Sequence, residues 1–196
     1  MLGSSHPIYD NNLISIISKI QPASILDLGC GKGKLGSIIK ESNIRSNLKS
    51  PLHLIGVNPL FDKVADNHLL STFGYDEVLD LTIDQYCEDH IDREVDIVTA
   101  LDVLEHLPRS KAFDVIDQML YHCKFMIIIW PISHPQYASG NTFDAHRSSF
   151  KARDIMQTFE VTTFMQTGFS QYSAHHTYNL TVLRGHMNIT QICPLF

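Results

Sequence analysis

The sequence predicts an α/β protein built around a largely parallel sheet, and three observations support this fold class. Segments with the apolar spacing of helices alternate along the chain with short apolar runs typical of buried strands. The chain has 196 residues, of which 44% are hydrophobic and 18% charged, and this is enough to bury one core. The sequence contains no internal repeat and no low-complexity linker. We therefore expect a single domain over residues 1–196.

The first half of the chain supplies the elements that begin the sheet. Residues 10–20 carry apolar side chains at helical spacing behind a capping residue, Asp10 or Asn11. A short apolar run at 24–28 leads into a group of glycines, after which helical spacing resumes at Leu35. In chain order, the remaining predicted elements of this half are a strand at 52–57, a short helix at 62–71, a weaker strand at 78–81 and a strand at 95–101.

The second half continues the alternation. A helix at 110–122 presents apolar side chains on one face, and the apolar run at 125–130 predicts a strand that Pro131 closes. A long polar segment over 131–149 follows. The remaining predicted elements are a helix near 151–158 and strands near 159–165 and 178–183, which bring the expected sheet to seven strands.

Composition and charge argue against several classes of protein. The formal net charge is −6, whereas nonspecific electrostatic binding to nucleic acid needs a positively charged surface. The longest apolar run, Phe125 to Trp130, is too short to span a bilayer. The N-terminus lacks the basic and apolar regions of a signal peptide. We therefore expect a cytoplasmic protein with neither a membrane nor a nucleic acid as its partner.

Neither the cysteines nor the histidines show the spacing of a metal site. The four cysteines form no CxxC pair, and we interpret them as free thiols in a reducing compartment. The eleven histidines lack HxxxH or HxxE spacing. We therefore expect no bound metal.

Glycines follow the first predicted strand, in Asp27-Leu28-Gly29-Cys30-Gly31-Lys32-Gly33. Glycine permits positive φ and close approach of a ligand to the backbone, and the helix that follows presents free N–H groups. An ordinary glycine-rich turn needs no acid before it, and a pyrophosphate site would disfavour one. The carboxylate of Asp27 instead suits a cationic ligand.

This pattern of strand, acid and GxGxG resembles the first motif of class I S-adenosylmethionine-dependent methyltransferases, whose cofactor carries an ammonium and a sulfonium. The resemblance continues in order along nearly the whole chain. It implies a Rossmann-like three-layer sandwich with a mostly parallel seven-stranded sheet and an antiparallel last strand. It also implies S-adenosylmethionine as the cofactor, held by the half of the chain over about 1–107. The residues assigned to the cofactor are Asp27, Gly29, Cys30, Gly31, Gly33, Asn58, Asp80, Leu101 and Asp102.

At two of these positions the match to the family is incomplete. The family carries an acid after the second strand to hold the ribose hydroxyls, and Asn58 stands there in this sequence. Asparagine can bond a hydroxyl, but it lacks the charge that strengthens the bond. After the third strand, the acid that reaches the adenine amine corresponds to Asp80 or to Thr82.

The stretch after the fourth predicted strand, Asp102-Val103-Leu104-Glu105-His106, is a second match. It resembles the segment that follows this strand in many small-molecule methyltransferases. Ligands of open α/β folds bind at the carboxyl edge of the sheet, so we expect Leu101 and Asp102 to line the site. Glu105 and His106 have two open interpretations. Either they cap and shape the turn, or His106 is a general base.

The polar segment over 131–149 is the predicted substrate loop. It is about eighteen residues long, and such loops in compact domains are commonly functional. Its Pro-Gln, Gly-Asn and His-x-Ser-x-aromatic motifs resemble those of a subgroup of small bacterial and phage-type methyltransferases. We assign His134, Gln136, Asn141 and Arg147 to substrate binding and His146 to catalysis. Alternatively, His146 and Arg147 cap the next helix or pin the loop.

The sequence therefore predicts an S-adenosylmethionine-dependent methyltransferase that acts on a small polar acceptor, such as a sugar or another hydroxyl or carboxyl compound. For a hydroxyl acceptor the candidate bases are His106 and His146, with His134 behind them. One alternative is another enzyme on the same scaffold, such as an aminopropyl transferase. A second is a non-catalytic methyltransferase-like subunit that binds the cofactor or a protein partner. An NAD(P) enzyme fits poorly because the chain lacks GxGxxG and an acid after the second strand.

Overall fold

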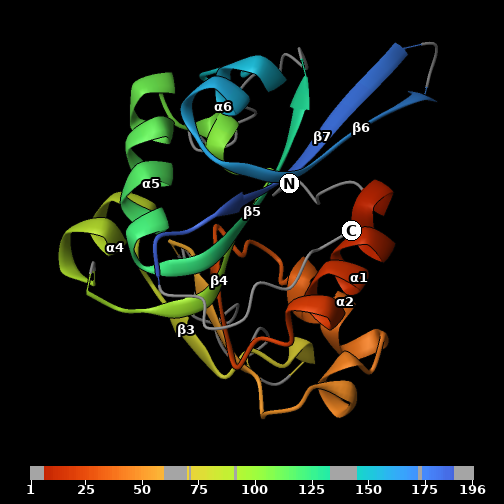
Figure 1. The fold of residues 1–196 in the computed structure, drawn as a ribbon, viewed down its shortest axis with the longest axis vertical. Helices are drawn as coiled ribbons and strands as arrows, with labels where there is room; N and C mark the ends of the chain where they lie inside the picture. Colours follow the sequence, from red (N-terminus) through yellow and green to blue (C-terminus); the bar gives the residue numbers. More distant parts are fainter. Residues whose placement is uncertain are drawn as a thin grey trace.

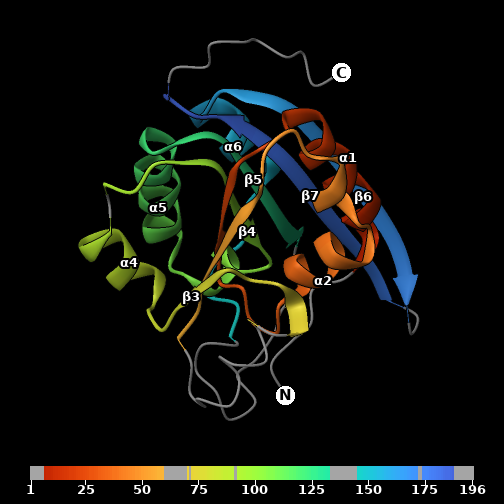
Figure 2. The ribbon, with the colours of Figure 1, turned by 90° about the horizontal axis from the view of Figure 1, so that it is seen from below.

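A seven-stranded sheet forms the centre of the computed structural model, which describes residues 7–59, 70, 72–90, 92–132, 145–171 and 174–187. The strand order is β3-β2-β1-β4-β5-β7-β6 (Figures 1 and 2). The strands are β1 (Ser24–Leu28), β2 (His53–Val57), β3 (Glu77–Leu79), β4 (Val95–Leu101), β5 (Cys123–Ile132), β6 (Val161–Gln171) and β7 (Ala174–Arg184). The α-helices are α1 (Asp10–Ile20), α2 (Lys34–Glu41), α4 (Ile83–Asp89), α5 (Arg109–Tyr121) and α6 (Ala152–Thr158).

The sheet is parallel except at β7. Strands β1 to β5 run parallel to one another, whereas β7 pairs antiparallel with both β5 and β6. Sheets of this kind are buried on both faces, and their central strands are accordingly almost continuous apolar runs. Strand β4 is an example, because only Asp96 and Thr99 interrupt its apolar sequence. The observed directions confirm the predicted fold class, including the antiparallel last strand.

Helices cover both faces of this sheet and make three layers (Figure 1). Helices α1 and α2 pack on one face, and α4 and α5 pack on the other. Successive strand residues point to opposite faces, so Ile97 belongs to the core under α1 and α2 while Val98 belongs to the core under α4 and α5. Within the described part of the chain, no helix is both long enough and apolar enough to cross a membrane.

The structure differs from the sequence prediction at a few elements. Helix α4 was not predicted, although its first turn carries a capping box. The Thr82 hydroxyl accepts the Gln85 N–H, and the Gln85 side chain accepts the Thr82 N–H. Strands β6 and β7 extend past the predicted apolar runs because their backbone pairing continues through polar residues. The predicted helix at 62–71 lies almost entirely outside the described residues.

Candidate active site

Four neighbouring parallel strands end at one edge of the sheet, and predicted cofactor residues follow each of them. Each of them directly follows its strand, with Gly29 after β1, Asn58 after β2, Asp80 after β3 and Asp102 after β4. Parallel strands bring their carboxyl ends to the same edge, so these four positions lie along one border of the sheet. This border is the candidate active site.

The turn after β1 needs its glycines for different reasons. Gly29 has a φ of 68°, and a Cβ at this position would overlap the Val103 side chain. The N–H groups of Gly29 and Cys30 donate to the Val57 carbonyl at 2.8 and 3.1 Å, which fastens the turn to β2. Gly31 has a φ of 51°, but a Cβ there would meet only one atom, a backbone oxygen 3.8 Å away. The backbone is therefore packed at Gly29 and approachable at Gly31.

Cys30 and Gly33 contribute to this turn through their backbones. The Cys30 side chain is buried against Gly56 and Tyr75, so it points into the protein. Gly33 has a φ of 80° and is the N-cap of α2, and its N–H donates to the Cys30 carbonyl at 2.8 Å. A glycine has no side chain with which to cap the helix. The positive end of the α2 dipole therefore faces the turn.

Asp27 lies beneath the glycine turn and is only 2% exposed. Its Oδ2 accepts the Tyr75 hydroxyl at 2.6 Å, and its Oδ1 accepts the Thr99 hydroxyl at 2.7 Å. Burial raises the pKa of Asp27 to about 6, although the two hydrogen bonds act in the opposite direction. The carboxyl group therefore carries its full charge only above about pH 6. Its direct contact with a cofactor stays a prediction.

Sequence reasoning gave no role to Tyr75 or Thr99. A signal for Thr99 was available, because it pairs with Asp27 in the register of β1 and β4 and a buried acid needs a donor. Tyr75 gave no comparable signal, because it precedes β3 in a connecting segment. It is nonetheless 3% exposed, and its burial, followed by the charge of Asp27, raises the pKa of its hydroxyl.

Asn58 and Asp80 occupy the positions predicted for ribose and adenine. The Asn58 N–H donates to the Leu79 carbonyl at 3.1 Å, and its side-chain Nδ2 donates to the Pro59 carbonyl at 3.3 Å. The acceptor that Asn58 offers a hydroxyl is thus its amide oxygen. Thr82 uses its hydroxyl to cap α4. Asp80 is exposed, and the assignment of either residue to the adenine position stays a prediction.

Leu101 and Asp102 lie where β4 ends. Leu101 is buried, and Asp102 adopts a left-handed φ of 54°, which aspartate tolerates better than most residues. The Asp102 N–H donates to the Ile129 carbonyl at 2.9 Å and holds this turn against β5. Tyr178 of β7 is near enough that burial, followed by the charges of Asp102 and Glu105, raises the pKa of its hydroxyl. Acidic and phenolic groups therefore gather at this end of β4.

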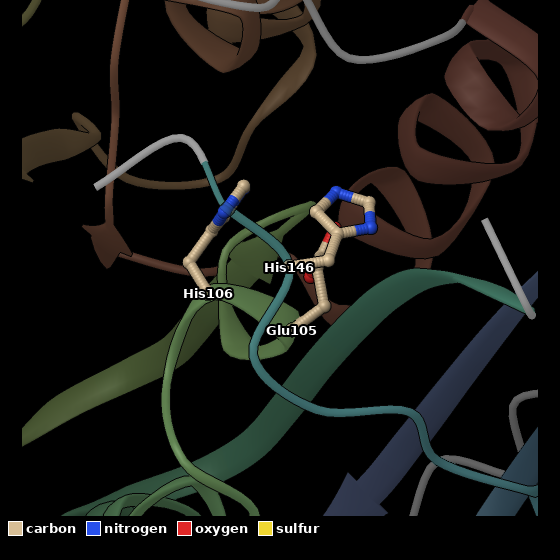
Figure 3. Close-up of side chains that lie close together, drawn as sticks. All are labelled: Glu105, His106 and His146. Carbon is tan, nitrogen blue, oxygen red and sulfur yellow. The ribbon is translucent and has the colours of Figure 1, made fainter. Parts of the chain in front are cut away.

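Glu105, His106 and His146 form a cluster (Figure 3), and Asp102 is near enough for its charge to act on Glu105. One potential ligand atom from each of the three side chains lies within 4.8 Å of the others. The imidazole rings meet edge to face with their centroids 4.9 Å apart. Glu105 is 2% exposed, and burial and the Asp102 charge raise its pKa well above the usual range. Two candidate bases and a buried acid thus share one location.

Backbone hydrogen bonds hold His146 at this location. The Arg147 and Ser148 N–H groups donate to the Glu105 carbonyl at 2.8 and 3.1 Å. On the other side of His146, the Ala145 carbonyl lies 3.2 Å from His106 Nδ1. A carbonyl can only accept, so Nδ1 carries the proton and Nε2 is the basic nitrogen of His106. The segment around His146 is therefore tied to the turn after β4 on both sides.

The same segment is anchored again before α6 begins. The indole Nε1 of Trp130 donates to the Phe150 carbonyl at 3.1 Å, and Arg109 donates to the Ser149 carbonyl at 3.1 Å. The Phe150 ring is buried and lies 5.9 Å from the Phe113 ring of α5. These contacts hold residues 149–150 in place between the candidate active site and helix α6.

The structure tests only part of the predicted substrate loop. His134, Gln136 and Asn141 lie outside the described residues. The Arg147 side chain is exposed, and its backbone N–H makes the bond to Glu105. Spacing along the sequence gave no indication of the three-residue cluster, because His146 is far in the chain from Glu105 and His106.

Comparisons with known proteins identify similar structures. No protein-family model matches the sequence, and no curated protein matches it. The methyltransferase domain of the bacterial CtHen1-CN protein is 16% identical with a TM-score of 0.62, over 91% of this chain and 98% of that chain. The proposed RNA methyltransferase PH1948 of Pyrococcus horikoshii is 15% identical with a TM-score of 0.59, over 91% and 82%.

A third similar structure was solved with bound SAM. It is the magnesium protoporphyrin IX methyltransferase ChlM of Synechocystis PCC 6803, which is 15% identical with a TM-score of 0.57, over 90% of this chain and 78% of that chain. At these identities the likeness is one of fold. The names of these proteins point to different acceptors, so the fold alone does not select one.

Proposed function

Since the chain has the fold of the class I S-adenosylmethionine-dependent methyltransferases, we propose that it binds S-adenosylmethionine and transfers the methyl group to a small polar acceptor. The observation that carries this proposal is the turn after β1. Its backbone is approachable at Gly31, and it lies above the buried carboxyl group of Asp27 at the carboxyl edge of the sheet. A cationic ligand suits a site with an acid at this position.

The residues along this edge fit the parts of the cofactor. We assign the ribose hydroxyls to the amide oxygen of Asn58 and the adenine amine to Asp80. Leu101 supplies an apolar surface at the end of β4, and Asp102 supplies a second negative charge there. The Gly31 backbone and the positive end of the α2 dipole border the same space, which suits the carboxylate of the cofactor.

His106 and His146 are the groups that can receive a proton from a hydroxyl acceptor. When bound, S-adenosylmethionine supplies a methyl group already activated by its sulfonium. The protein then has to hold the acceptor oxygen in line and receive its proton. His106 presents Nε2 for this purpose because its Nδ1–H donates to the Ala145 carbonyl. His146, with its ring beside that of His106, is the alternative base.

A neutral hydroxyl compound such as a sugar fits this edge better than a carboxylate does. Asp102 lies at the site, and a carboxylate acceptor would meet repulsion from its charge. The net charge of −6 likewise disfavours a polyanion held by charge alone. The half-exposed imidazoles offer hydrogen bonds that a sugar hydroxyl can use.

Calorimetric titration with S-adenosylmethionine, and separately with S-adenosylhomocysteine, tests the proposal. We expect micromolar binding, on the order of −8 kcal/mol. Gly31→Ala should weaken binding because its Cβ enters the space assigned to the cofactor. Gly74→Ala is the matched control, because Gly74 also has a positive φ and open space but precedes β3 at the opposite edge.

Two other results would redirect the proposal. Folded protein that binds neither compound would rule out the cofactor assignment and would favour a subunit that acts through a protein partner. Binding without methyl transfer to any tested sugar or small acid would favour a non-catalytic cofactor-binding subunit. The presence of Asn58 in place of the acid after β2 is the feature that motivates this second candidate.

A further inference from the structure

We propose that Glu105, His106 and His146 form a binding site for a divalent first-row transition metal ion. The proposed site is argued from the geometry of these three side chains, and its role in methyl transfer rests on the function proposed above. Glu105 and His106 belong to the turn after β4, and His146 belongs to the segment before α6. Figure 3 shows the three side chains close together where these two segments meet.

Glu105 gives the strongest indication that a cation belongs here. The side chain is 2% exposed, and its Oε2 is buried without a hydrogen-bond partner among the described residues. Leaving a buried acceptor without a partner is unfavourable, and a charged one more so. Asp102 adds a negative charge beside it, which together with burial disfavours the charged form of Glu105. A bound cation would satisfy the oxygen, favour the carboxylate form of Glu105 and offset the charge of Asp102.

The imidazoles are held in a form that suits ligation. His106 donates from Nδ1 to the Ala145 carbonyl, so Nε2 is the unprotonated ring nitrogen, which is the form that ligates a metal. Metal-bound histidines typically donate their other ring nitrogen to a carbonyl or carboxylate in this way. His146 is fixed through its neighbours, because the N–H groups of Arg147 and Ser148 are bonded to the carbonyl of Glu105 itself.

An ion can be accepted after rotation of the side chains. The three ligand atoms lie within 4.8 Å of one another. Metal–ligand distances of about 2.0–2.2 Å place neighbouring ligand atoms of a tetrahedral site about 3.3–3.6 Å apart, and only ligands on opposite sides of an ion are about 4.4 Å apart. Rotations about χ1 and χ2 of the two half-buried histidines would have to bring the ligand atoms closer by up to about 1.5 Å.

The ligand types select the class of ion. Imidazole nitrogens suit zinc, iron, cobalt and nickel, whereas magnesium prefers oxygen ligands and keeps several waters. Two imidazoles and one carboxylate leave at least one coordination position open, as in catalytic rather than structural zinc sites. We therefore expect Zn²⁺, Co²⁺ and Mn²⁺ to bind more tightly than Mg²⁺.

The open position gives the ion a role with a hydroxyl acceptor. A hydroxyl oxygen bound to the ion has a lowered pKa, so its proton can pass to solvent or to a nearby base. The deprotonated oxygen forms the new bond to the methyl carbon while the bond between that carbon and sulfur breaks, and S-adenosylhomocysteine is the second product. No electron is gained or lost in the step.

The first experiment measures metal binding itself. The 196-residue chain is treated with a chelator, dialysed, and titrated by calorimetry with Zn²⁺, Co²⁺, Mn²⁺ and Mg²⁺, with visible absorption recorded for Co²⁺. We expect one transition ion per chain, with bands from nitrogen-coordinated cobalt. His146→Ala and Glu105→Gln should each weaken this binding by at least about tenfold. His186→Ala, which removes an exposed histidine outside the cluster, should not change it.

The outcomes separate the metal site from the proposed function. Absence of stoichiometric binding, or equal affinity in wild type and His146→Ala, would overturn the site. Circular dichroism of each variant checks folding. If Glu105→Gln does not fold, His146→Ala decides, because the His146 side chain is only half-buried. Titration with S-adenosylmethionine in the presence of chelator tests the cofactor alone, so retained cofactor binding without metal binding defeats only the metal site.

Discussion

Tyr75 and Asp27 are 48 residues apart in the chain, yet a hydrogen bond of 2.6 Å joins them beneath the glycine turn. The bond links the segment before β3 to the end of strand β1, and the hydroxyl of Thr99 in β4 donates to the other oxygen of Asp27. The turn proposed to bind the cofactor therefore depends on residues outside the glycine motif.

Tyr75→Phe should destabilise the protein by about 1–3 kcal/mol, because it leaves a buried carboxylate oxygen without its donor. Urea unfolding at pH 7.5 measures the change. Tyr121→Phe, which alters a tyrosine that is 61% exposed, serves as the control and should leave the free energy of unfolding unchanged. Equal stability of Tyr75→Phe and wild type would show that the Tyr75 bond makes no net contribution.

The raised pKa of Asp27 predicts that its contribution to stability depends on pH. The pKa is about 6 in the folded protein against 3.8 for the ordinary group, so the folded state binds the proton more tightly. Stability from this group is fully present below about pH 4 and is lost as the pH rises through 6, by about 3 kcal/mol in total. Asp27→Asn should flatten this part of the profile, measured by urea unfolding between pH 4 and 7.5.

Cofactor affinity should follow the opposite trend with pH. The Asp27 carboxylate is charged only above about pH 6, so we expect affinity for the cationic cofactor to increase as the pH rises from 5 to 7. Calorimetry on wild type and Asp27→Asn measures this increase, which the variant should lack. Asp92→Asn, an exposed acid before β4, controls for a general loss of charge. A pH trend that persists in Asp27→Asn would assign the effect to another group.

Gly29→Ala should destabilise the protein because the added methyl group overlaps the Val103 side chain and the backbone is in the left-handed region. A loss of about 2 kcal/mol or more is expected from overpacking and backbone strain together. Val103→Ala in the same chain should recover part of it by removing the overlap. A double-mutant cycle of thermal unfolding measures the recovery, and strict additivity of the two changes would contradict the packing argument.

His146→Ala should lower turnover more than it lowers affinity for S-adenosylmethionine, since we place this side chain on the acceptor side. Once an acceptor is found, steady-state kinetics and calorimetry on the same preparation give the two quantities. Arg153→Ala, at an exposed position of α6, is the control for a change near this segment. An equal loss of turnover and cofactor affinity would move His146 to the cofactor side or to the fold.

The succession of helices and strands along the chain and the glycine turn could be predicted because both are encoded locally. The strand at Ser24–Leu28 and the helix at Asp10–Ile20 have the predicted bounds, since apolar spacing and the first glycine mark their ends. Helix α4 was missed because only one turn of it carries a recognisable signal, the Thr82 capping box.

The details of the site depend on contacts between distant segments, which spacing cannot reveal. Asp27 was predicted as a cofactor residue, but its burial and its bond to Tyr75 emerge only when the segment before β3 packs against β1. His106 and His146 were each predicted as site residues. Their side chains lie together beside Glu105 only because the segment before α6 is hydrogen-bonded to the turn after β4. Long-range backbone hydrogen bonds of this kind have no local sequence signal.

The anchoring of residues 145–150 has a consequence for how acceptor preference can be changed. The bonds to the Glu105, Phe150 and Ser149 carbonyls use backbone acceptors, so they place few demands on side chains at the anchor points. The stretch between Ile132 and Ala145 is thereby bracketed by two fixed ends. Because we propose that this stretch binds the acceptor, we expect that sequences grafted between these two ends would change the acceptor while the cofactor edge and the position of His146 are kept.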